Sequence, residues 1–200
     1  MVAGSVCILA GGLSSRLGRD KAALRLGRRT LLGHIRARAG ELGWPVRVLR
    51  RDRVPRCGPL GGIYTALLTG RGPAVLFLAC DMPFVSRELL EKILAEFQRS
   101  SHALFVAGAG RAGFPCVLPH SALPIVRAQL ERQQFSMQAL ARALKGRSMA
   151  PVDELDLFNV NTPQDWEQAR QFWSERFRPA LSSRRPKDGQ PPLVIGGRRV

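Results

Sequence analysis

The chain has 200 residues, which is enough for one domain to bury a full hydrophobic core without disulfides or metals. Apolar residues make up 45% and charged residues 23%, a balance that excludes a largely disordered protein. The net charge of +16 is unusual and suggests an anionic partner such as nucleic acid, a phosphorylated small molecule or a membrane surface.

The positive charge is concentrated at the two ends of the chain. Residues 1–60 hold 13 basic and 3 acidic side chains, whereas residues 61–175 hold 11 of each. Residues 176–200 hold 7 basic and 1 acidic side chain, with several prolines and glycines. We therefore expect a globular domain over residues 1–177 and a mobile, basic Pro/Gly-rich tail over residues 178–200.

The cysteine spacing and the hydropathy favour a cytoplasmic protein without membrane contact. Cys7, Cys57, Cys80 and Cys116 lie far apart with no C-x-x-C pair, which argues against a zinc site or a disulfide framework. No 18-residue apolar run predicts a transmembrane helix. The short apolar stretch Val2–Ala10 has no basic segment before it, so no signal peptide is expected.

Strands and helices alternate along the chain. Short apolar runs predict buried strands, and helical spacing of apolar residues predicts the elements between them. In the first half these are strand Ser5–Ala10, helix Thr30–Leu42, strand Val46–Leu49, helix Leu60–Leu68 opened by Gly58-Pro59, and strand Ala74–Ala79. In the second half they are helix Ser86–Gln98, strands His102–Ala107 and Phe114–Leu118, helices Ser121–Glu131 and Ser136–Leu144, strand Leu157–Val160, and a helix capped by Thr162.

This alternation predicts a three-layer α/β, Rossmann-like fold with a mostly parallel central sheet. Ligands in such sheets bind at the carboxyl ends of the strands, where the unusual loops of this chain are expected.

The first candidate site is the glycine-rich segment after the first strand. Gly11 and Gly12 let backbone N–H groups approach a phosphate closely, and Arg16 and Lys21 add positive charge there. A bare Gly-Gly turn needs no function, but its combination with two cations favours a phosphate site. The segment matches neither G-x-x-x-x-G-K-[ST] nor G-x-G-x-x-G, which argues against an ordinary NTPase or dinucleotide-binding fold.

Asp81 is the second candidate, because it follows the strongest predicted strand. A lone carboxylate at that position suits Mg²⁺, which keeps several waters and shares its shell with substrate phosphates. An aspartate that caps the turn before Pro83 is the structural alternative, and a phosphate loop on the neighbouring strand favours the metal.

Two further segments carry candidate residues. Asp52 precedes a glycine-rich run over residues 58–62, which allows close backbone approach at a helix start, although a plain helix entry would look the same. Asn159 and Asn161 precede a helix, where one asparagine suffices as a cap, so that two at alternate positions invite a second role as ligand donors.

Four motifs resemble, in order, those of the molybdenum cofactor guanylyltransferases, a family of the nucleotidyltransferase superfamily. They are LAGGLSSRLGRDKAAL (9–24), DRVPRCGPLGGIYTAL (52–67), LACDMPF (78–84) and FNVNTPQDW (158–166), and the resemblance covers roughly residues 4–174. Ala10-Gly11-Gly12 is the guanylyl form of the first motif, because cytidylyl-transferring relatives tend to carry Ala-Ala-Gly.

The resemblance implies transfer of GMP from GTP to the terminal phosphate of molybdopterin, with release of pyrophosphate. The residues that match the nucleotide side are Leu9, Ala10, Gly11, Gly12, Arg16, Lys21 and Asp52. Asp81 matches the Mg²⁺ ligand and would act in catalysis with Arg16 and Lys21. Asn159 and Asn161 match a motif on the pterin side, and the implied protein partners are the molybdenum insertion protein and molybdoenzyme chaperones.

The chain departs from the family between the first helix and Asp52. Residues 41–51 leave room for one strand at most, where the family has a strand, a nucleotide-contacting loop and a further helix. Arg56 stands where the D-x-x-P-G-x-G-P pattern has glycine.

Two alternative functions stay open: a related transferase that uses another nucleotide or phosphorylated acceptor, and a non-catalytic nucleotide- or nucleic-acid-binding protein. The chain lacks any helix-turn-helix, RNA-recognition or zinc-finger pattern, which argues against nucleic acid.

Overall fold

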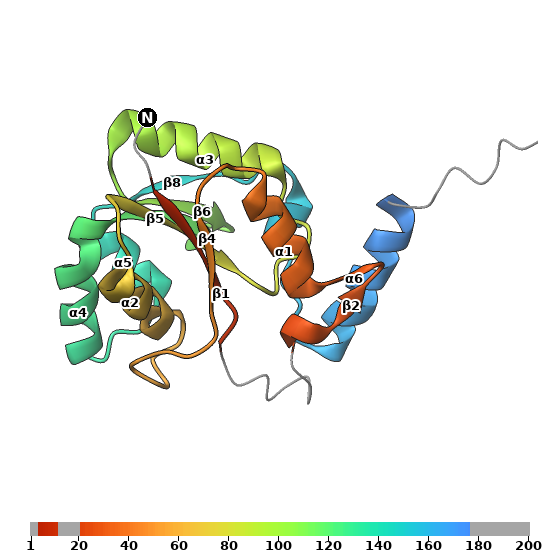
Figure 1. The fold of residues 1–200 in the computed structure, drawn as a ribbon, viewed down its shortest axis with the longest axis horizontal. Coiled ribbons are helices and arrows are strands. Elements are labelled where there is room, and N and C mark those ends of the chain that lie inside the picture. Colours follow the sequence, from red (N-terminus) through yellow and green to blue (C-terminus); the bar gives the residue numbers. More distant parts are fainter. Residues whose placement is uncertain (1–3, 12–20, 177–200) are drawn as a thin grey trace, which may run out of the picture.

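The computed structural model describes residues 4–11 and 21–176 (Figure 1). Its strands are β1 Ser5–Leu9, β2 Arg25–Leu26, β3 Arg29–Thr30, β4 Val46–Leu49, β5 Ala74–Ala79, β6 Leu104–Gly108, β7 Arg111–Pro119 and β8 Arg147–Met149. Its α-helices are α1 Leu31–Gly40, α2 Pro59–Thr69, α3 Arg87–Ser100, α4 Leu123–Glu131, α5 Met137–Ala143 and α6 Pro163–Arg176. The 3₁₀ helices are η1 Lys21–Ala23, η2 His120–Ala122 and η3 Glu154–Leu157. The predicted tail, residues 178–200, lies outside the described residues.

Six strands form the central sheet in the order β4-β1-β5-β7-β6-β8. Strand β7 is antiparallel to both of its neighbours, whereas the other neighbouring pairs are parallel. The three-layer architecture and the mostly parallel sheet confirm the predicted fold class. Because β4, β1 and β5 are adjacent and parallel, their carboxyl ends meet at one edge of the sheet.

Helices cover both faces of the sheet because side chains alternate along each strand (Figure 1). Ile8 and Leu76 belong to a buried cluster with the apolar sides of α1 and α3. Cys7 and Phe77, one position along in each strand, belong to the cluster beneath α2, α4 and α5. None of the described helices has the length and apolar character needed to cross a membrane.

A third cluster joins the β2–β3 hairpin to α6 at the side of the domain (Figure 1). Its buried members include Leu26 and Val160. The rings of Phe84, Phe158 and Phe172 meet edge to face, with centroids 5.4, 5.8 and 6.2 Å apart. This packing fixes the segment before α6, which carries the two candidate asparagines, against the segment that follows Asp81.

Local signals in the sequence predicted the elements well. Strands Val46–Leu49 and Ala74–Ala79 have the predicted limits. Ser86 caps α3 by accepting a hydrogen bond from the backbone N–H of Leu89, at 3.2 Å. Thr162 caps α6 in the same manner, through its hydroxyl and the N–H of Asp165 at 3.1 Å. Side-chain caps depend on neighbouring residues alone, which is why they could be read from the sequence.

The predicted strand Leu157–Val160 is wrong. Residues 154–157 form η3, because the side chains of Asp153 and Asp156 make a capping box around its first turn. The run from Phe158 to Asn161 follows without joining the sheet. The short strands β2, β3 and β8 were not predicted, since two or three residues give no readable periodicity.

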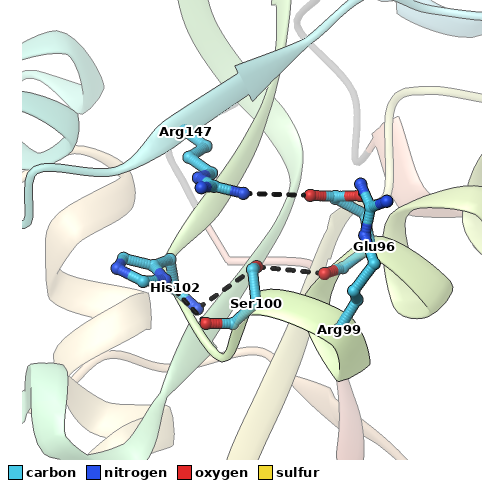
Figure 2. A network of polar contacts seen from close by, with 5 residues as sticks. All are labelled: Glu96, Arg99, Ser100, His102 and Arg147. Carbon is cyan, nitrogen blue, oxygen red and sulfur yellow. Dashed lines mark hydrogen bonds and ion pairs between the residues drawn. The ribbon is translucent and has the colours of Figure 1, made fainter.

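Strand β8 forms the sheet edge opposite β4, and a polar network links it to α3 (Figure 2). Arg147 of β8 donates to Glu96 at 3.3 Å, and Glu96 also pairs with Arg99. The Ser100 hydroxyl donates to the Glu96 carbonyl at 3.0 Å. The side chains of Arg99 and Arg147 are more than half exposed, so each ion pair contributes at most about 1 kcal/mol. The network therefore ties β8, the edge strand farthest from β4, to α3.

Candidate active site

The loops that follow β1, β4 and β5 surround a cavity of about 720 Å³. Main-chain hydrogen bonds continue past the strand ends and fix these loops: the Ala10 N–H donates to the Leu49 carbonyl at 2.8 Å, and the Cys80 N–H donates to the Leu9 carbonyl at 3.1 Å. The predicted site residues that line the cavity are Leu9, Ala10, Gly11, Lys21, Asp52 and Asp81. Their positions agree with the rule that ligands bind at the carboxyl ends of parallel strands.

Glycines let the backbone approach Asp52 closely. A Cβ at Gly61 would lie 2.5 Å from the Val54 carbonyl oxygen and 3.1 Å from Oδ2 of Asp52. A Cβ at Gly62 would lie 3.3 Å from Oδ1 of the same carboxylate. The Asp52 carboxylate therefore rests against the first turn of α2, where the helix presents backbone N–H groups.

Asp52 accepts no hydrogen bond from any residue in the described ranges, although it lines the cavity. Burial raises the pKa of this carboxyl above its ordinary value. A partly buried carboxylate with unused acceptor capacity is a natural ligand for an N–H group of a bound molecule.

Asp81, Lys21 and Asn161 form the polar centre of the site. Lys21 Nζ donates to Asn161 Oδ1 at 2.6 Å and lies 3.7 Å from Asp81 Oδ2. Burial raises the pKa of Asp81, and the nearby Lys21 charge offsets part of that effect. The ammonium group therefore lies between the metal-candidate carboxylate and the loop before α6.

The loop before α6 is anchored to the Asp81 segment by its main chain. The Val160 N–H donates to the Asp81 carbonyl at 2.9 Å. Asp156, which is fully buried, accepts from the N–H groups of Ser86 at 2.7 Å, Val152 at 3.0 Å and Asp153 at 2.8 Å. One carboxylate thus joins the start of α3 to the turn that precedes the two asparagines, a role that the sequence did not indicate.

The two asparagines occupy different environments. Val160 is buried between them. Asn161 contacts Lys21, whereas Asn159 is exposed and donates to the Leu157 carbonyl at 2.7 Å. The structure therefore brings Asn161 to the cavity residues and leaves Asn159 outside their hydrogen-bond network. Gly12 and Arg16, the other predicted site residues, lie outside the described residues.

Phe114 also lines the cavity and was missed by sequence reasoning. Phe114 is the first residue of the predicted strand Phe114–Leu118. If that strand were parallel to β5, Phe114 would lie at the amino ends of the strands, away from the cavity. Strand β7 instead reverses after β6 through Ala109 and Gly110, which have φ values of 48° and 72°, as a tight hairpin turn requires. The two-residue turn was the only local signal that could have revealed this reversal.

Residues 41–51 contain one strand, as predicted, and β4 is consequently an edge strand. Arg56, which stands where the family pattern has glycine, has a φ of 62°. Glycine adopts this left-handed conformation without steric cost. The backbone at position 56 therefore has the conformation that favours glycine, although the residue here is arginine. Arg56 lines the cavity, as do Asp52 and Pro59.

The side chains around Asp81 suit a magnesium ion better than a metal that is bound by three or more protein ligands. No group of three or more His, Cys, Asp or Glu side chains that could hold a metal ion occurs in residues 4–11 and 21–176. Asp81 is a single, partly exposed carboxylate on a large cavity, with 20% of its side chain accessible. Mg²⁺ commonly takes one or two carboxylates and completes its shell with water and substrate phosphates, which this arrangement permits.

Comparison with known proteins assigns the family. A sequence model of the MobA-like NTP transferase domain matches residues 6–149. The chain is 31% identical to a probable molybdenum cofactor guanylyltransferase of Carboxydothermus hydrogenoformans, over 85% of this chain and 96% of that protein. It is 28% identical to a molybdenum cofactor guanylyltransferase of Rhizobium leguminosarum, over 86% of this chain and 93% of that protein.

The fold also matches that of a solved structure. The molybdopterin-guanine dinucleotide biosynthesis protein A of Archaeoglobus fulgidus superposes with a TM-score of 0.69 at 21% identity, covering 86% of this chain and 99% of that chain. Sequence and fold therefore agree, and the chain belongs to the molybdenum cofactor guanylyltransferase family of MobA-like nucleotidyltransferases.

Proposed function

We propose that this enzyme transfers GMP from GTP to the terminal phosphate of molybdopterin, giving the guanine dinucleotide cofactor and pyrophosphate. The observation that carries the proposal is a single cavity lined by the β1 loop, Lys21, Asp52 and Asp81. The names of relatives that align over almost their whole length support the same reaction. Residues 1–177 would form the transferase domain.

In the proposed nucleotide complex, the triphosphate lies along the β1 loop beside Lys21. Leu9, Ala10 and Gly11 contribute backbone and apolar contacts, and the resemblance adds Gly12 and Arg16 on the triphosphate. Guanine carries adjacent N–H donors on its Watson–Crick edge, which suit the unused acceptor capacity of Asp52. This contact would favour GTP over CTP.

The chemistry is an in-line displacement at phosphorus. An oxygen of the molybdopterin phosphate attacks the α-phosphorus of GTP, and the bond from that phosphorus to the α–β bridging oxygen breaks as pyrophosphate leaves. The nucleophile is already ionised, so no strong general base is required, and catalysis consists of positioning and charge neutralisation. Lys21 and Arg16 would neutralise the departing pyrophosphate.

We propose Mg²⁺ as the cofactor, with Asp81 as its protein ligand. When bound, the ion supplies neutralisation of charge on the phosphate oxygens. Lys21 keeps a hydrogen-bond partner in Asn161 and so does not need Asp81 to hold its position. Asp81 is therefore available for the metal, since the Lys21 ammonium lies beyond hydrogen-bond distance from its carboxylate.

The loop before α6 is the proposed acceptor side. Asn159 is exposed there and is the proposed donor to the pterin, whereas Asn161 accepts a hydrogen bond from Lys21, on the proposed nucleotide side.

All four cysteines are buried without a disulfide, which supports a cytoplasmic location. We also propose transient contact with the molybdenum insertion protein and with molybdoenzyme chaperones.

The test uses the purified full-length protein with Mg-GTP and molybdopterin bound to its insertion protein. Pyrophosphate release and guanylylated cofactor are expected only when nucleotide, Mg²⁺ and acceptor are all present. Preference for CTP would contradict the nucleotide assignment. Pyrophosphate release from GTP without guanylylated cofactor would contradict the acceptor.

A further inference from the structure

A second cavity, of about 630 Å³, lies between α1, the β2–β3 turn, the segment leading into α3, and the end of α6. It shares no lining residue with the active-site cavity. Its lining contains the arginines Arg28, Arg29, Arg38, Arg87 and Arg176 and a single acidic residue, Glu41. We call it the basic cavity.

Its five arginines are not equivalent. Three already pair with an acid: Arg38 with Glu41 at 2.8 Å, Arg87 with Glu91 at 2.7 Å, and Arg176 with Asp153 at 2.9 Å. Arg28 and Arg29, at the tip of the β2–β3 hairpin, form no ion pair with any residue of the described ranges. The unneutralised charge of the cavity therefore comes from two adjacent residues at one side.

The hairpin tip is fixed in place, so its arginines are presented from a rigid support. Gly27 has a φ of 61°, and a Cβ there would lie 2.5 Å from the indole nitrogen of Trp173. His34 Nε2 donates to the Leu26 carbonyl at 2.7 Å, and the His34 and Trp173 rings lie 4.5 Å apart. These contacts hold the tip against α1 and α6, which lowers the entropy lost when a ligand binds.

Part of the cavity lining is apolar, and we call this part its floor. It consists of Pro83, Phe84 and Val85, which are buried, and Ala37 of α1. A small polyphosphate would need several unneutralised cations converging on one point, which two neighbouring arginines above an apolar floor do not provide. The arrangement instead suits an extended chain whose carboxylates meet the arginines while an apolar side chain covers the floor.

We propose that the basic cavity binds an acidic peptide segment of a partner protein. Carboxylates of that segment would pair with Arg28 and Arg29, and an aromatic or aliphatic side chain would lie over Phe84 and Val85. Residues 177–200 of this chain contain six basic residues and one acidic residue, a composition that does not complement the charge of the two arginines, whereas an acidic partner segment does. Phe84 follows Asp81 by three residues in the sequence, and the two cavities share no lining residue. The partner would therefore dock beside the active-site cavity and not in it.

The probe is a fluorescein-labelled synthetic peptide, Glu-Asp-Glu-Phe-Glu-Asp, titrated with the full-length protein and followed by fluorescence anisotropy. The variant is Arg28→Glu/Arg29→Glu. The matched control is Arg71→Glu/Arg132→Glu, which makes the same change in net charge at exposed arginines outside the basic cavity. We expect the first pair to weaken binding by about tenfold and the control pair by less than about twofold.

Two further arms test the floor and the kind of ligand. A peptide with Ser in place of Phe should bind about fivefold more weakly. Inorganic pyrophosphate at constant ionic strength and Mg-GTP should not displace the labelled peptide, and GTP turnover should be unchanged in Arg28→Glu/Arg29→Glu. Absence of saturable binding, equal losses in the two double variants, or displacement by pyrophosphate would each overturn the proposal, whatever the outcome for guanylyl transfer.

Discussion

The ammonium group of Lys21 donates to the side-chain oxygen of Asn161, which is 140 residues away in the sequence, at 2.6 Å. This hydrogen bond joins the proposed nucleotide side of the cavity to the loop before α6. It also holds Lys21 at 3.7 Å from Asp81, close enough for attraction and too far for a hydrogen bond. Asn161 is thus a positioning residue for Lys21, and this role can be tested separately from acceptor binding.

Replacing Asn161 with alanine should impair nucleotide handling. Without its partner, Lys21 should move toward the Asp81 carboxylate, where it would compete with the proposed metal and lose its proposed contact with the triphosphate. We expect the KM for GTP to rise and kcat to fall, by about tenfold in kcat/KM, the loss of roughly one charge-assisted hydrogen bond. Steady-state kinetics with each substrate varied in turn provide the measurement.

Asn159→Ala is the matched control, because Asn159 makes no contact with Lys21 and hydrogen bonds to the Leu157 carbonyl instead. This variant should raise the KM for molybdopterin and leave that for GTP unchanged. An Asn161→Ala enzyme that changes only in the KM for molybdopterin would show that the Lys21 contact has no catalytic consequence.

Asp81→Asn should abolish transfer and stabilise the fold. Loss of the carboxylate that we propose as the metal ligand should lower kcat/KM by at least about 100-fold, or ~3 kcal/mol. Burial raises the pKa of Asp81, so its contribution to stability is present in acid and lost as the pH rises through the raised pKa. At neutral pH the ionised group costs stability, and the neutral amide should raise the midpoint of thermal unfolding.

Unfolding of Asp81→Asn followed by circular dichroism at pH 7.5 and at pH 3 separates the two effects. The gain over the wild type should be present at the higher pH and shrink in acid, where Asp81 is itself protonated. A lower midpoint at pH 7.5 would mean that the Lys21 attraction outweighs the burial of the carboxylate.

Asp156→Ala should destabilise the protein by about 3 kcal/mol, because three backbone N–H groups lose a buried acceptor. Glu154→Ala, in the same 3₁₀ helix at an exposed position, is the control and should change the free energy of unfolding by less than about 0.5 kcal/mol. Urea denaturation measures both. Similar values for the two variants would refute the anchoring role of Asp156.

His34 should make stability depend on pH. Burial lowers the pKa of His34 below its ordinary value of 6.5; the hydrogen bond to the Leu26 carbonyl offsets part of this effect, and repulsion from Arg29 and Arg38 adds to it. The unfolded chain therefore binds the proton more readily, so this contribution to stability is complete above pH 6.5 and lost as the pH falls. His34→Gln should lose less stability than the wild type between pH 7.5 and pH 5.5, as judged from urea midpoints. Parallel losses would remove His34 as the cause.

Sequence reasoning worked where a signal was local. Asp81 follows an apolar run long enough to identify a buried strand, and Ser86 caps the helix that begins beside it. It failed where the determinant was distant or short. The direction of β7, and with it the position of Phe114, depends on a two-residue turn. The Lys21–Asn161 hydrogen bond joins motifs that the sequence assigned separately to nucleotide and pterin.

The main-chain hydrogen bond from Val160 to Asp81 has a consequence for how specificity can change within such enzymes. A main-chain contact is independent of side-chain identity, so the residue at position 159 can be replaced without losing the hydrogen bond that holds this loop to Asp81. On the proposed role of this loop, new acceptors can be accommodated by substitution on one short segment, while the residues that we propose for phosphate chemistry stay in place at the strand ends.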